Sequence, residues 1–125
     1  MQELTERFID ALHRLHADDD VEPMTALYAD DAQLSKLGLE HQEHGPEGAR
    51  QFWRAYRDVF GDIEATFTHT VQDRDSVALE WTSTGTLRDG SPISYQGISV
   101  VVGEESITAF RTYYDSAPFQ NVQPG

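Results

Sequence analysis

The sequence places one carboxylate in a setting that could support acid–base chemistry. Glu80 lies within an apolar segment, between Leu79 and Trp81. Apolar surroundings disfavour the charged form of a carboxyl group and raise its pKa, which suits a general base. The alternation of the segment favours another interpretation, because it puts Glu80 with Thr82 and Thr84 opposite Leu79 and Trp81. That face would then meet solvent or a second subunit, and we take this interpretation as the stronger one.

Aromatic residues supply the other candidate groups. A buried phenolic hydroxyl needs a hydrogen-bonding partner, so tyrosines are the best candidates for polar contacts to a ligand. The tyrosines that we predict to contact a ligand are Tyr28, Tyr56, Tyr95 and Tyr114. Aromatic side chains at such spacings are more often core than cofactor site. We expect Trp53 and Phe110 to line the apolar part of a ligand pocket, and Thr112 to contact the ligand.

Two pairs of histidines have a spacing that can share a metal ion. His13 and His16 are three residues apart in a helical segment, and His41 and His44 are three apart in a loop. Neither pair has the His-Glu-x-x-His pattern of a helical zinc site, and we predict no metal. We expect the helical pair to be solvated on the polar side of its helix.

Composition narrows the class of protein. The chain has 125 residues, 38% of them hydrophobic, and a formal net charge of −13 with a single lysine, Lys36. Such a charge repels phosphate backbones and anionic lipid, which argues against nucleic-acid and membrane partners. There is no cysteine, and the acidic N-terminal segment lacks the pattern of a signal peptide, so we expect a cytoplasmic protein. Whether the acidic surface serves solubility alone or a high-salt habitat stays open.

The N-terminal half has helical periodicity. Four apolar residues follow the spacing of an amphipathic helix: Leu4, Phe8, Leu12 and Leu15. Pro23 suits the first turn of a short second helix that includes Tyr28. Pro46 suits the first turn of a third helix, which we expect to reach Phe60. We predict a short strand over residues 32–37 and a loop over residues 38–45.

After Gly61 the period changes to that of strands. Turn-forming residues separate four predicted strands, at residues 63–71, 77–87, 93–102 and 107–115. Strands this long must twist and bend, and Gly85 and Gly97 are natural places for a bulge or bend. We predict one α+β domain over residues 1–125, with three N-terminal helices on a curved, mainly antiparallel sheet that forms a cone-shaped barrel. Residues 116–125 form a frayed tail from which Phe119 could cover the pocket mouth, and the exposed back of the sheet predicts a homodimer.

This order of elements resembles the SnoaL-like branch of the nuclear transport factor 2-like, or ketosteroid isomerase-like, superfamily. Four segments carry the resemblance, which covers roughly residues 3–115: Ala26-Leu27-Tyr28-Ala29-Asp30-Asp31-Ala32, Gly45-Pro46-Glu47-Gly48-Ala49-Arg50-Gln51-Phe52-Trp53, Val77-Ala78-Leu79-Glu80-Trp81-Thr82-Ser83-Thr84-Gly85-Thr86 and Arg111-Thr112-Tyr113-Tyr114-Asp115. The resemblance implies a cone-shaped pocket that hosts several reactions. It also implies that the even-numbered residues around Glu80 face the pocket, and that His44 rims it.

The usual catalytic groups of that superfamily are absent. In ketosteroid isomerase-like members, the resemblance puts a tyrosine where this chain has Phe8 and the base at or next to Lys36. The strand expected to hold the oxyanion acid, residues 95–102, contains no carboxylate. In epoxide hydrolase-like and cyclase-like members, the catalytic aspartate falls at Thr112, whose hydroxyl cannot activate water as a carboxylate does.

Three functions follow as hypotheses. The first is a module that binds a small apolar molecule in an aromatic pocket, without a cofactor and with at most weak catalysis. The second is an acid–base enzyme, of isomerase, cyclase or hydrolase type, that uses Glu80 on a small hydrophobic metabolite. The third is a dimerisation or scaffold domain with a sealed core. The ligand itself cannot be deduced from the sequence.

Overall fold

The computed structural model describes residues 1–37 and 43–119 of the chain. Its elements follow one another in the order α1 (Gln2–Asp18), α2 (Glu22–Thr25), β1 (Tyr28–Lys36), β2 (Glu43–His44), α3 (Gly45–Asp58), β3 (Phe60–Gln72), β4 (Ser76–Leu87), β5 (Pro92–Gly103), β6 (Ile107–Tyr114) and the 3₁₀ turn η1 (Ala117–Phe119). The predicted α+β class, with three N-terminal helices on a mainly antiparallel sheet, is confirmed.

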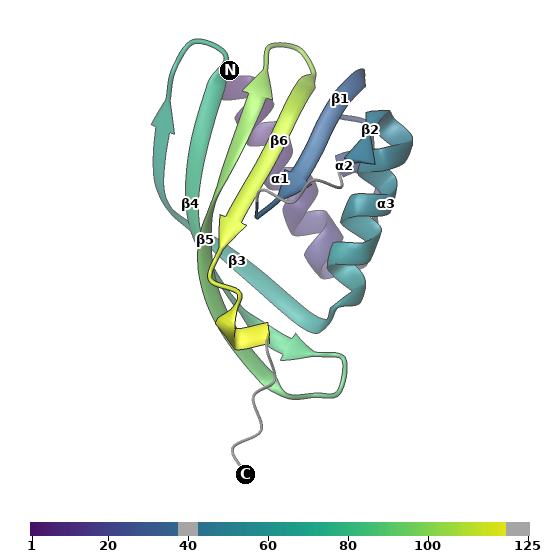
Figure 1. The fold of residues 1–125 in the computed structure, drawn as a ribbon, viewed down its shortest axis with the longest axis vertical. Coiled ribbons are helices and arrows are strands. Elements are labelled where there is room, and N and C mark those ends of the chain that lie inside the picture. The colour runs from purple at the N-terminus through teal and green to yellow at the C-terminus, as the bar shows by residue number, and fades with distance from the viewer. Residues whose placement is uncertain (38–42, 120–125) are drawn as a thin grey trace.

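The strands form one sheet in the order β2-β1-β6-β5-β4-β3. Only β1 and β6 run parallel, and the other neighbours are antiparallel. The sheet is open rather than closed into a barrel, since β2 and β3 form its two edges. The strands bend along their length, and the helices lie together on one side of them (Figure 1). The helix-covered face is called the inner face below, and the opposite face the outer face.

The second and third helices end earlier than predicted, and the predicted loop over residues 38–45 contains the short strand β2 (Glu43–His44). The second helix ends before Tyr28, which instead begins β1 and lies opposite Ile107 of β6. The third helix ends at Asp58, so Phe60 begins β3 and not the last helical turn. In both cases pairing with another strand decides the conformation of an apolar residue whose local spacing also fits a helix.

The inner face carries the buried side of each long strand. In β4 the odd-numbered residues Val77, Leu79, Trp81 and Ser83 are buried, and Glu80 between them is exposed. Residues buried against α1 and α2 form a larger apolar cluster around Phe8. A smaller cluster lies at the other end of the sheet and consists of Phe60, Ile63, Trp81, Ile93 and Tyr95. The space between the two clusters is where the site lies.

Gly85 allows the sheet to bend at its β3 edge. The register of β3 shifts between Phe60 and Ile63, and Ile63 pairs with Gly85. A Cβ atom on Gly85 would lie 2.0 Å from the carbonyl oxygen of Asp62. The bulge of β3 therefore depends on the missing side chain, as the prediction of a bend at this glycine requires.

No helix among the described residues is both long and apolar enough to cross a membrane.

We predict that Gly85→Ala lowers the free energy of unfolding by about 2 kcal/mol or more, because the new methyl group overlaps backbone atoms that can move only with the bulge. Thr84→Ala, at the exposed neighbouring position, should change it by no more than about 0.5 kcal/mol. Urea unfolding followed by far-UV circular dichroism measures both. Equal, small effects would show that the bulge does not need a glycine opposite it.

Candidate functional site

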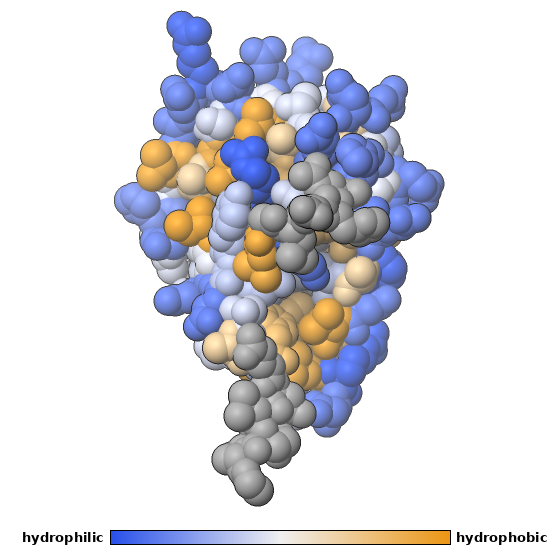
Figure 2. All heavy atoms as spheres, in the orientation of Figure 1, coloured by the Kyte–Doolittle hydropathy of each residue, from blue (hydrophilic) through white to orange (hydrophobic). Residues whose placement is uncertain are grey.

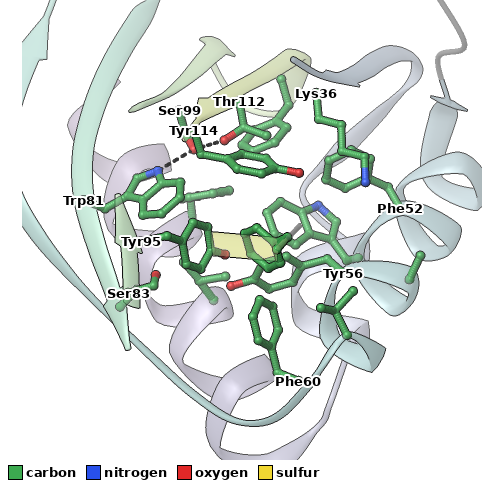
Figure 3. Close-up of a pocket in the computed structure, with 18 of the residues that line it drawn as sticks. Lys36, Phe52, Tyr56, Phe60, Trp81, Ser83, Tyr95, Ser99, Thr112 and Tyr114 are labelled. Carbon is green, nitrogen blue, oxygen red and sulfur yellow. Dashed lines mark hydrogen bonds between the residues drawn. The ribbon is translucent and has the colours of Figure 1, made fainter. Parts of the chain in front are cut away.

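A cavity of about 260 Å³ lies between α1, α3 and the inner face of the sheet. Eleven of its nineteen lining residues are aromatic. They come from both apolar clusters, from α3 and from the C-terminal turn (Figure 3): Phe8, Phe52, Trp53, Tyr56, Phe60, Phe67, Trp81, Tyr95, Phe110, Tyr114 and Phe119. The other lining residues are Leu12, Lys36, Ala55, Val59, Ala65, Ser83, Ser99 and Thr112.

The wall formed by β4, β5 and β6 contains a chain of hydrogen bonds. The indole N–H of Trp81 donates to the Ser99 hydroxyl at 3.0 Å, and Ser99 and Thr112 share a hydrogen bond of 2.9 Å between their hydroxyls (Figure 3). Ser99 and Thr112 face one another across β5 and β6, and all three side chains are buried. This chain fixes the indole ring against the sheet and satisfies polar atoms that the apolar cavity would otherwise leave without partners.

A second polar contact links the cavity to α1. The Tyr56 hydroxyl lies 2.6 Å from Nε2 of His16, and the Tyr56 ring lines the cavity. Nδ1 of His16 has no hydrogen-bonding partner among the described residues. A buried N–H without an acceptor is rarer than a lone pair without a donor, so the geometry favours the tautomer with its proton on Nε2. In that tautomer His16 donates to Tyr56, and the Tyr56 proton is free to point into the cavity.

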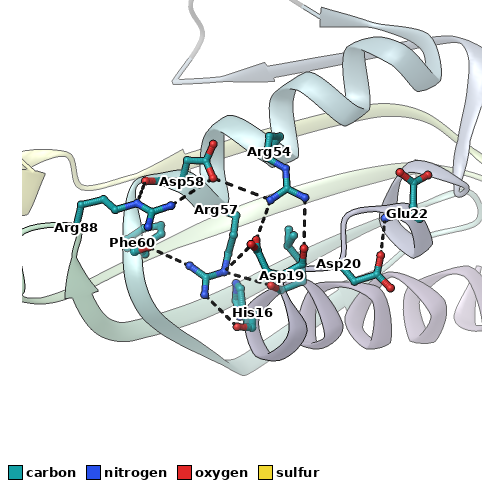
Figure 4. A network of polar contacts seen from close by, with 10 residues as sticks. His16, Asp19, Asp20, Glu22, Arg54, Arg57, Asp58, Phe60 and Arg88 are labelled. Atoms are coloured by element: carbon teal, nitrogen blue, oxygen red, sulfur yellow. Dashed lines mark hydrogen bonds and ion pairs between the residues drawn. The ribbon is translucent and has the colours of Figure 1, made fainter.

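Arg57 holds the end of α1 against α3 around His16. Its guanidinium donates to the carbonyl oxygens of Leu15, His16 and Phe60 at 3.2, 3.4 and 3.0 Å. Asp19 accepts from Arg54 at 2.8 Å and completes the network beside it (Figure 4). Burial, with the nearby Arg57 charge, lowers the pKa of His16 to about 4. The imidazole is therefore neutral at pH 7.

The tyrosines of the cavity are hydrogen-bond donors over the physiological pH range. Burial raises the pKa of Tyr56, of Tyr95 and of Tyr114 above the ordinary value, and a neighbouring phenol raises it further for Tyr56 and Tyr95. The hydroxyls of Tyr56 and Tyr95 point toward one another across the cavity (Figure 3). Their protons are available to an acceptor atom between or beside them.

Six of the predicted ligand-contacting residues line the cavity: Trp53, Tyr56, Tyr95, Phe110, Thr112 and Tyr114. Tyr28 lies behind the wall, where its hydroxyl accepts a 2.9 Å hydrogen bond from the Trp53 indole. His44 is exposed in β2, immediately before α3, and is not among the lining residues. Its backbone pairs with β1 opposite Gln33.

Glu80 lies outside the cavity. It is exposed on the outer face of β4, beside a shallow hollow that also contains Gln96 and Tyr113. Strict alternation places Leu79 and Trp81 on the inner face. The alternation of the sequence therefore predicted the orientation of β4 correctly, and the family resemblance did not. The apolar neighbours of Glu80, Leu79 and Trp81, are buried on the inner face, away from its carboxylate. A role for Glu80 as a base inside the cavity does not fit this geometry.

Thirteen of the nineteen lining residues, and His16, which contacts Tyr56, were not among the predicted site residues. Ser99 and Lys36 line the cavity, and Phe119 packs on Tyr95 with a ring separation of 4.6 Å. The expectation that Phe119 could fold back over the pocket mouth is thus confirmed. His16 was expected to be solvated and is only 7% exposed. Its helical spacing from Leu12, an apolar residue one turn earlier, was the signal that could have placed it inward.

The described residues contain no group of three or more metal-ligating side chains. His41, one member of the predicted loop pair, lies outside the described residues.

The positions that the resemblance implies as catalytic have other residue types here. Phe8 and Lys36 both line the cavity, where ketosteroid isomerase-like members are expected to have a tyrosine and a base. Thr112 lines it as well, with its hydroxyl bonded to Ser99. Among the described residues, no carboxylate lines the cavity. The arrangement can enclose an apolar body and donate hydrogen bonds, and it provides no carboxylate to abstract a proton.

The family assignment follows from comparison with known proteins. A model of the SnoaL-like domain matches residues 5–116, nearly the whole chain. The chain belongs to the SnoaL-like domain family. The SnoaL-like domain is a member of the nuclear transport factor 2-like superfamily, whose proteins include small-molecule-binding domains and enzymes of isomerase, cyclase and hydrolase type. A comparison of this SnoaL-like domain with curated protein sequences found no match.

Solved structures show the same fold at low sequence identity. An NTF2-like protein from Anabaena variabilis superposes with a TM-score of 0.84 at 15% identity, covering 94% of this SnoaL-like domain and 90% of that chain. TerC, co-crystallised with polyporic acid, has a TM-score of 0.77 at 16% identity, with 93% and 94% covered. An LEH-like epoxide hydrolase from M. tuberculosis has a TM-score of 0.71 at 19% identity, with 93% and 83% covered.

The lowered pKa of His16 predicts a pH-dependent stability. Above pH 6.5 the imidazole is neutral in both the folded and the unfolded state. Between pH 6.5 and about pH 4 it is protonated in the unfolded chain and stays neutral in the folded chain. Stability therefore falls as the pH decreases through this window. We expect the free energy of unfolding to fall by about 2 kcal/mol more between pH 7 and pH 5 in the wild type than in His16→Phe.

Urea unfolding at a series of pH values measures the difference. His69→Gln removes an exposed histidine of β3 and should keep the wild-type slope. A slope of His16→Phe equal to that of the wild type would contradict the burial of a neutral imidazole.

Proposed function

We propose that this SnoaL-like domain binds a small, mainly apolar molecule of one or two rings in the cavity between α1, α3 and the sheet. The single observation that carries the proposal is the cavity itself, an aromatic hollow inside an otherwise well-packed domain. Open, apolar cavities with a few directed polar groups are the usual form of small-molecule sites.

The size of the cavity sets the size of the ligand. Its volume of about 260 Å³ lies between the ~150 Å³ that can hold a benzene ring and the ~300 Å³ at which pockets for drug-sized ligands begin. Exposed Val59, at the end of α3, lines the cavity and marks where it reaches the surface. In the space-filling view apolar surface gathers between α3 and η1 (Figure 2). A ligand can enter there.

The polar groups of the cavity support binding rather than acid–base turnover. The tyrosine hydroxyls stay protonated because burial raises their pKa, and Ser99 and Thr112 already bond one another. The alternative of an acid–base enzyme based on Glu80 gains no support from this geometry, since that carboxylate lies on the outer face.

Filling the cavity should abolish binding. Ala65 lines the cavity from β3, and Ala65→Phe places a ring in the space that a ligand would occupy. We expect a neutral two-ring probe, 2-naphthamide, to bind the wild type and to bind Ala65→Phe at least tenfold more weakly. Both tryptophans, Trp53 and Trp81, line the cavity. Their two indole N–H signals in a proton–nitrogen NMR spectrum therefore report binding at this site.

Two control variants keep the cavity intact. Thr66→Phe adds the same ring at the adjacent exposed position of β3, and Glu80→Gln removes the outer carboxylate. Both should bind the probe as the wild type does. If Ala65→Phe still binds the probe, the probe does not bind in this cavity. If Thr66→Phe also fails to bind, the loss in Ala65→Phe does not report filling of the cavity.

We also propose that the domain forms a homodimer through the outer face of its sheet. Large apolar side chains are exposed there: Val71 is 59% exposed, Ile98 41% and Tyr113 45%. Ile98 and Tyr113 face one another across β5 and β6, beside the hollow that contains Glu80. Exposed apolar groups gathered on one face are typical of a surface that another protein covers.

Sedimentation equilibrium tests this association. We expect the wild type to have a mass of twice the 14.1 kDa chain. We expect Ile98→Glu to be a monomer, because a symmetric contact would bring the new carboxylates of the two subunits close together, and their repulsion destabilises the dimer. A wild type that sediments as a monomer at all concentrations would refute the dimer and leave the ligand proposal standing.

A further inference from the structure

The single lysine of the chain lies at the cavity. Lys36 is the last residue of β1 and pairs with Thr112 of β6. It is exposed, yet it is one of the cavity-lining residues, and its side chain extends beside Phe52 toward the interior (Figure 3). An amphipathic side chain can lie along an aromatic wall in this way and keep its charge at the edge.

Lys36 is the only charged residue among those that line the cavity in the described part of the chain. The ion pairs of the described residues are made by Arg50, Arg54, Arg57 and Arg88, and none involves Lys36. This separation is informative in a chain that has 22 acidic and nine basic residues. The acidic side chains surround the domain, and the described cavity wall holds a cation and no acid.

The neutral polar groups of the cavity can, like the lysine, donate hydrogen bonds. The hydroxyls of Tyr56, Tyr95 and Tyr114 keep their protons and can donate. If Nε2 of His16 is the protonated nitrogen, as its unpartnered Nδ1 favours, the Tyr56 proton cannot be used by His16. A cation and several O–H donors around one apolar space are complementary to acceptor oxygens and to negative charge.

We propose that the ligand is an anionic aromatic or alicyclic molecule, such as a small carboxylic acid or an acidic phenol, whose negative group pairs with Lys36 at the cavity edge while its ring occupies the aromatic interior. The assignment rests on the proposed function and narrows it to a class of ligand. Lys36 is a binding residue that confers charge selectivity. The acidic surface of the domain does not prevent entry, because the Debye length is about 8 Å at physiological salt.

Three probes of matched shape separate the possibilities: 2-naphthoate is anionic, 2-naphthamide is neutral and 2-naphthylmethylamine is cationic. Isothermal titration calorimetry with the wild type should give an affinity for 2-naphthoate at least fivefold higher than that for the amide, as a partly exposed ion pair allows. The ammonium probe should bind most weakly. The amide reports the apolar cavity alone, and the difference between the probes reports Lys36.

Two variants locate the charge effect. Lys36→Met keeps the length and apolar stem of the side chain, and should remove the preference for 2-naphthoate while 2-naphthamide binds within about twofold of the wild type. Arg111→Met removes the same charge one residue from Thr112, on the outer face of β6, and should preserve the preference. Equal affinities of the wild type for naphthoate and amide, or tightest binding of the ammonium probe, would overturn the assignment of an anionic ligand.

The outcomes also distinguish this inference from the proposal beneath it. If the amide binds and naphthoate shows no advantage, the cavity binds small molecules and only the role of Lys36 is wrong. If Lys36→Met weakens both probes equally, Lys36 supports the shape of the cavity and its charge selects nothing, which likewise overturns the inference. If none of the three probes binds the wild type, both proposals are overturned.

Discussion

The contact of Trp81 with Gly97 determines the shape of the inner wall. The two residues pair across β4 and β5, and a Cβ atom on Gly97 would lie 2.8 Å from the Trp81 ring and 2.3 Å from the Tyr113 carbonyl oxygen. Because the glycine leaves this space empty, the indole can lie across the sheet and donate to Ser99. The ring then forms a wall of the cavity instead of filling it, and the larger and smaller apolar clusters stay separate.

The junction of α1 and α3 shows how one arginine maintains a buried polar pair. Arg57 donates to the carbonyl oxygens of Leu15 and His16 at the end of α1, and the Leu15 oxygen also accepts from the backbone N–H of Asp19. Its charge next to His16 adds to the effect of burial, so the imidazole stays neutral and its contact with Tyr56 becomes one between uncharged groups. A neutral pair avoids the large desolvation cost of an ion at the apolar cavity. The orientation of the Tyr56 hydroxyl is thereby coupled to the packing of two helices.

The distribution of charge divides the molecule into an acidic exterior and a cavity whose described wall has no acid. The net charge of −13 belongs to the exterior, whereas Lys36 and the tyrosine hydroxyls give the cavity one cation and several O–H donors. Salt screens the exterior charges over about 8 Å, whereas the tyrosine hydroxyls lie in the buried part of the cavity, with Lys36 at its exposed edge. The superfamily's fold is retained here with a cavity lined by aromatic side chains and one lysine.

The sequence by itself determined the fold class, the strand period and the inward face of β4. Alternation over Val77, Leu79 and Trp81 is a local property, because successive side chains of any strand point to opposite sides. The sequence also predicted five of the eleven aromatic lining residues, since side chains such as Trp53, Tyr95 and Phe110 are apolar enough to be buried in any fold of this class.

Only the tertiary structure decided the polar half of the site. The partners of His16, Ser99 and Lys36 are 40, 13 and 76 positions away along the chain, at Tyr56, Thr112 and Thr112. No periodicity within one element specifies such pairs. Tyr28 could not be separated from the cavity residues for the same reason, because its partner Trp53 lies on α3. Burial was readable from local pattern, but the direction of each hydrogen bond depends on how strands and helices meet.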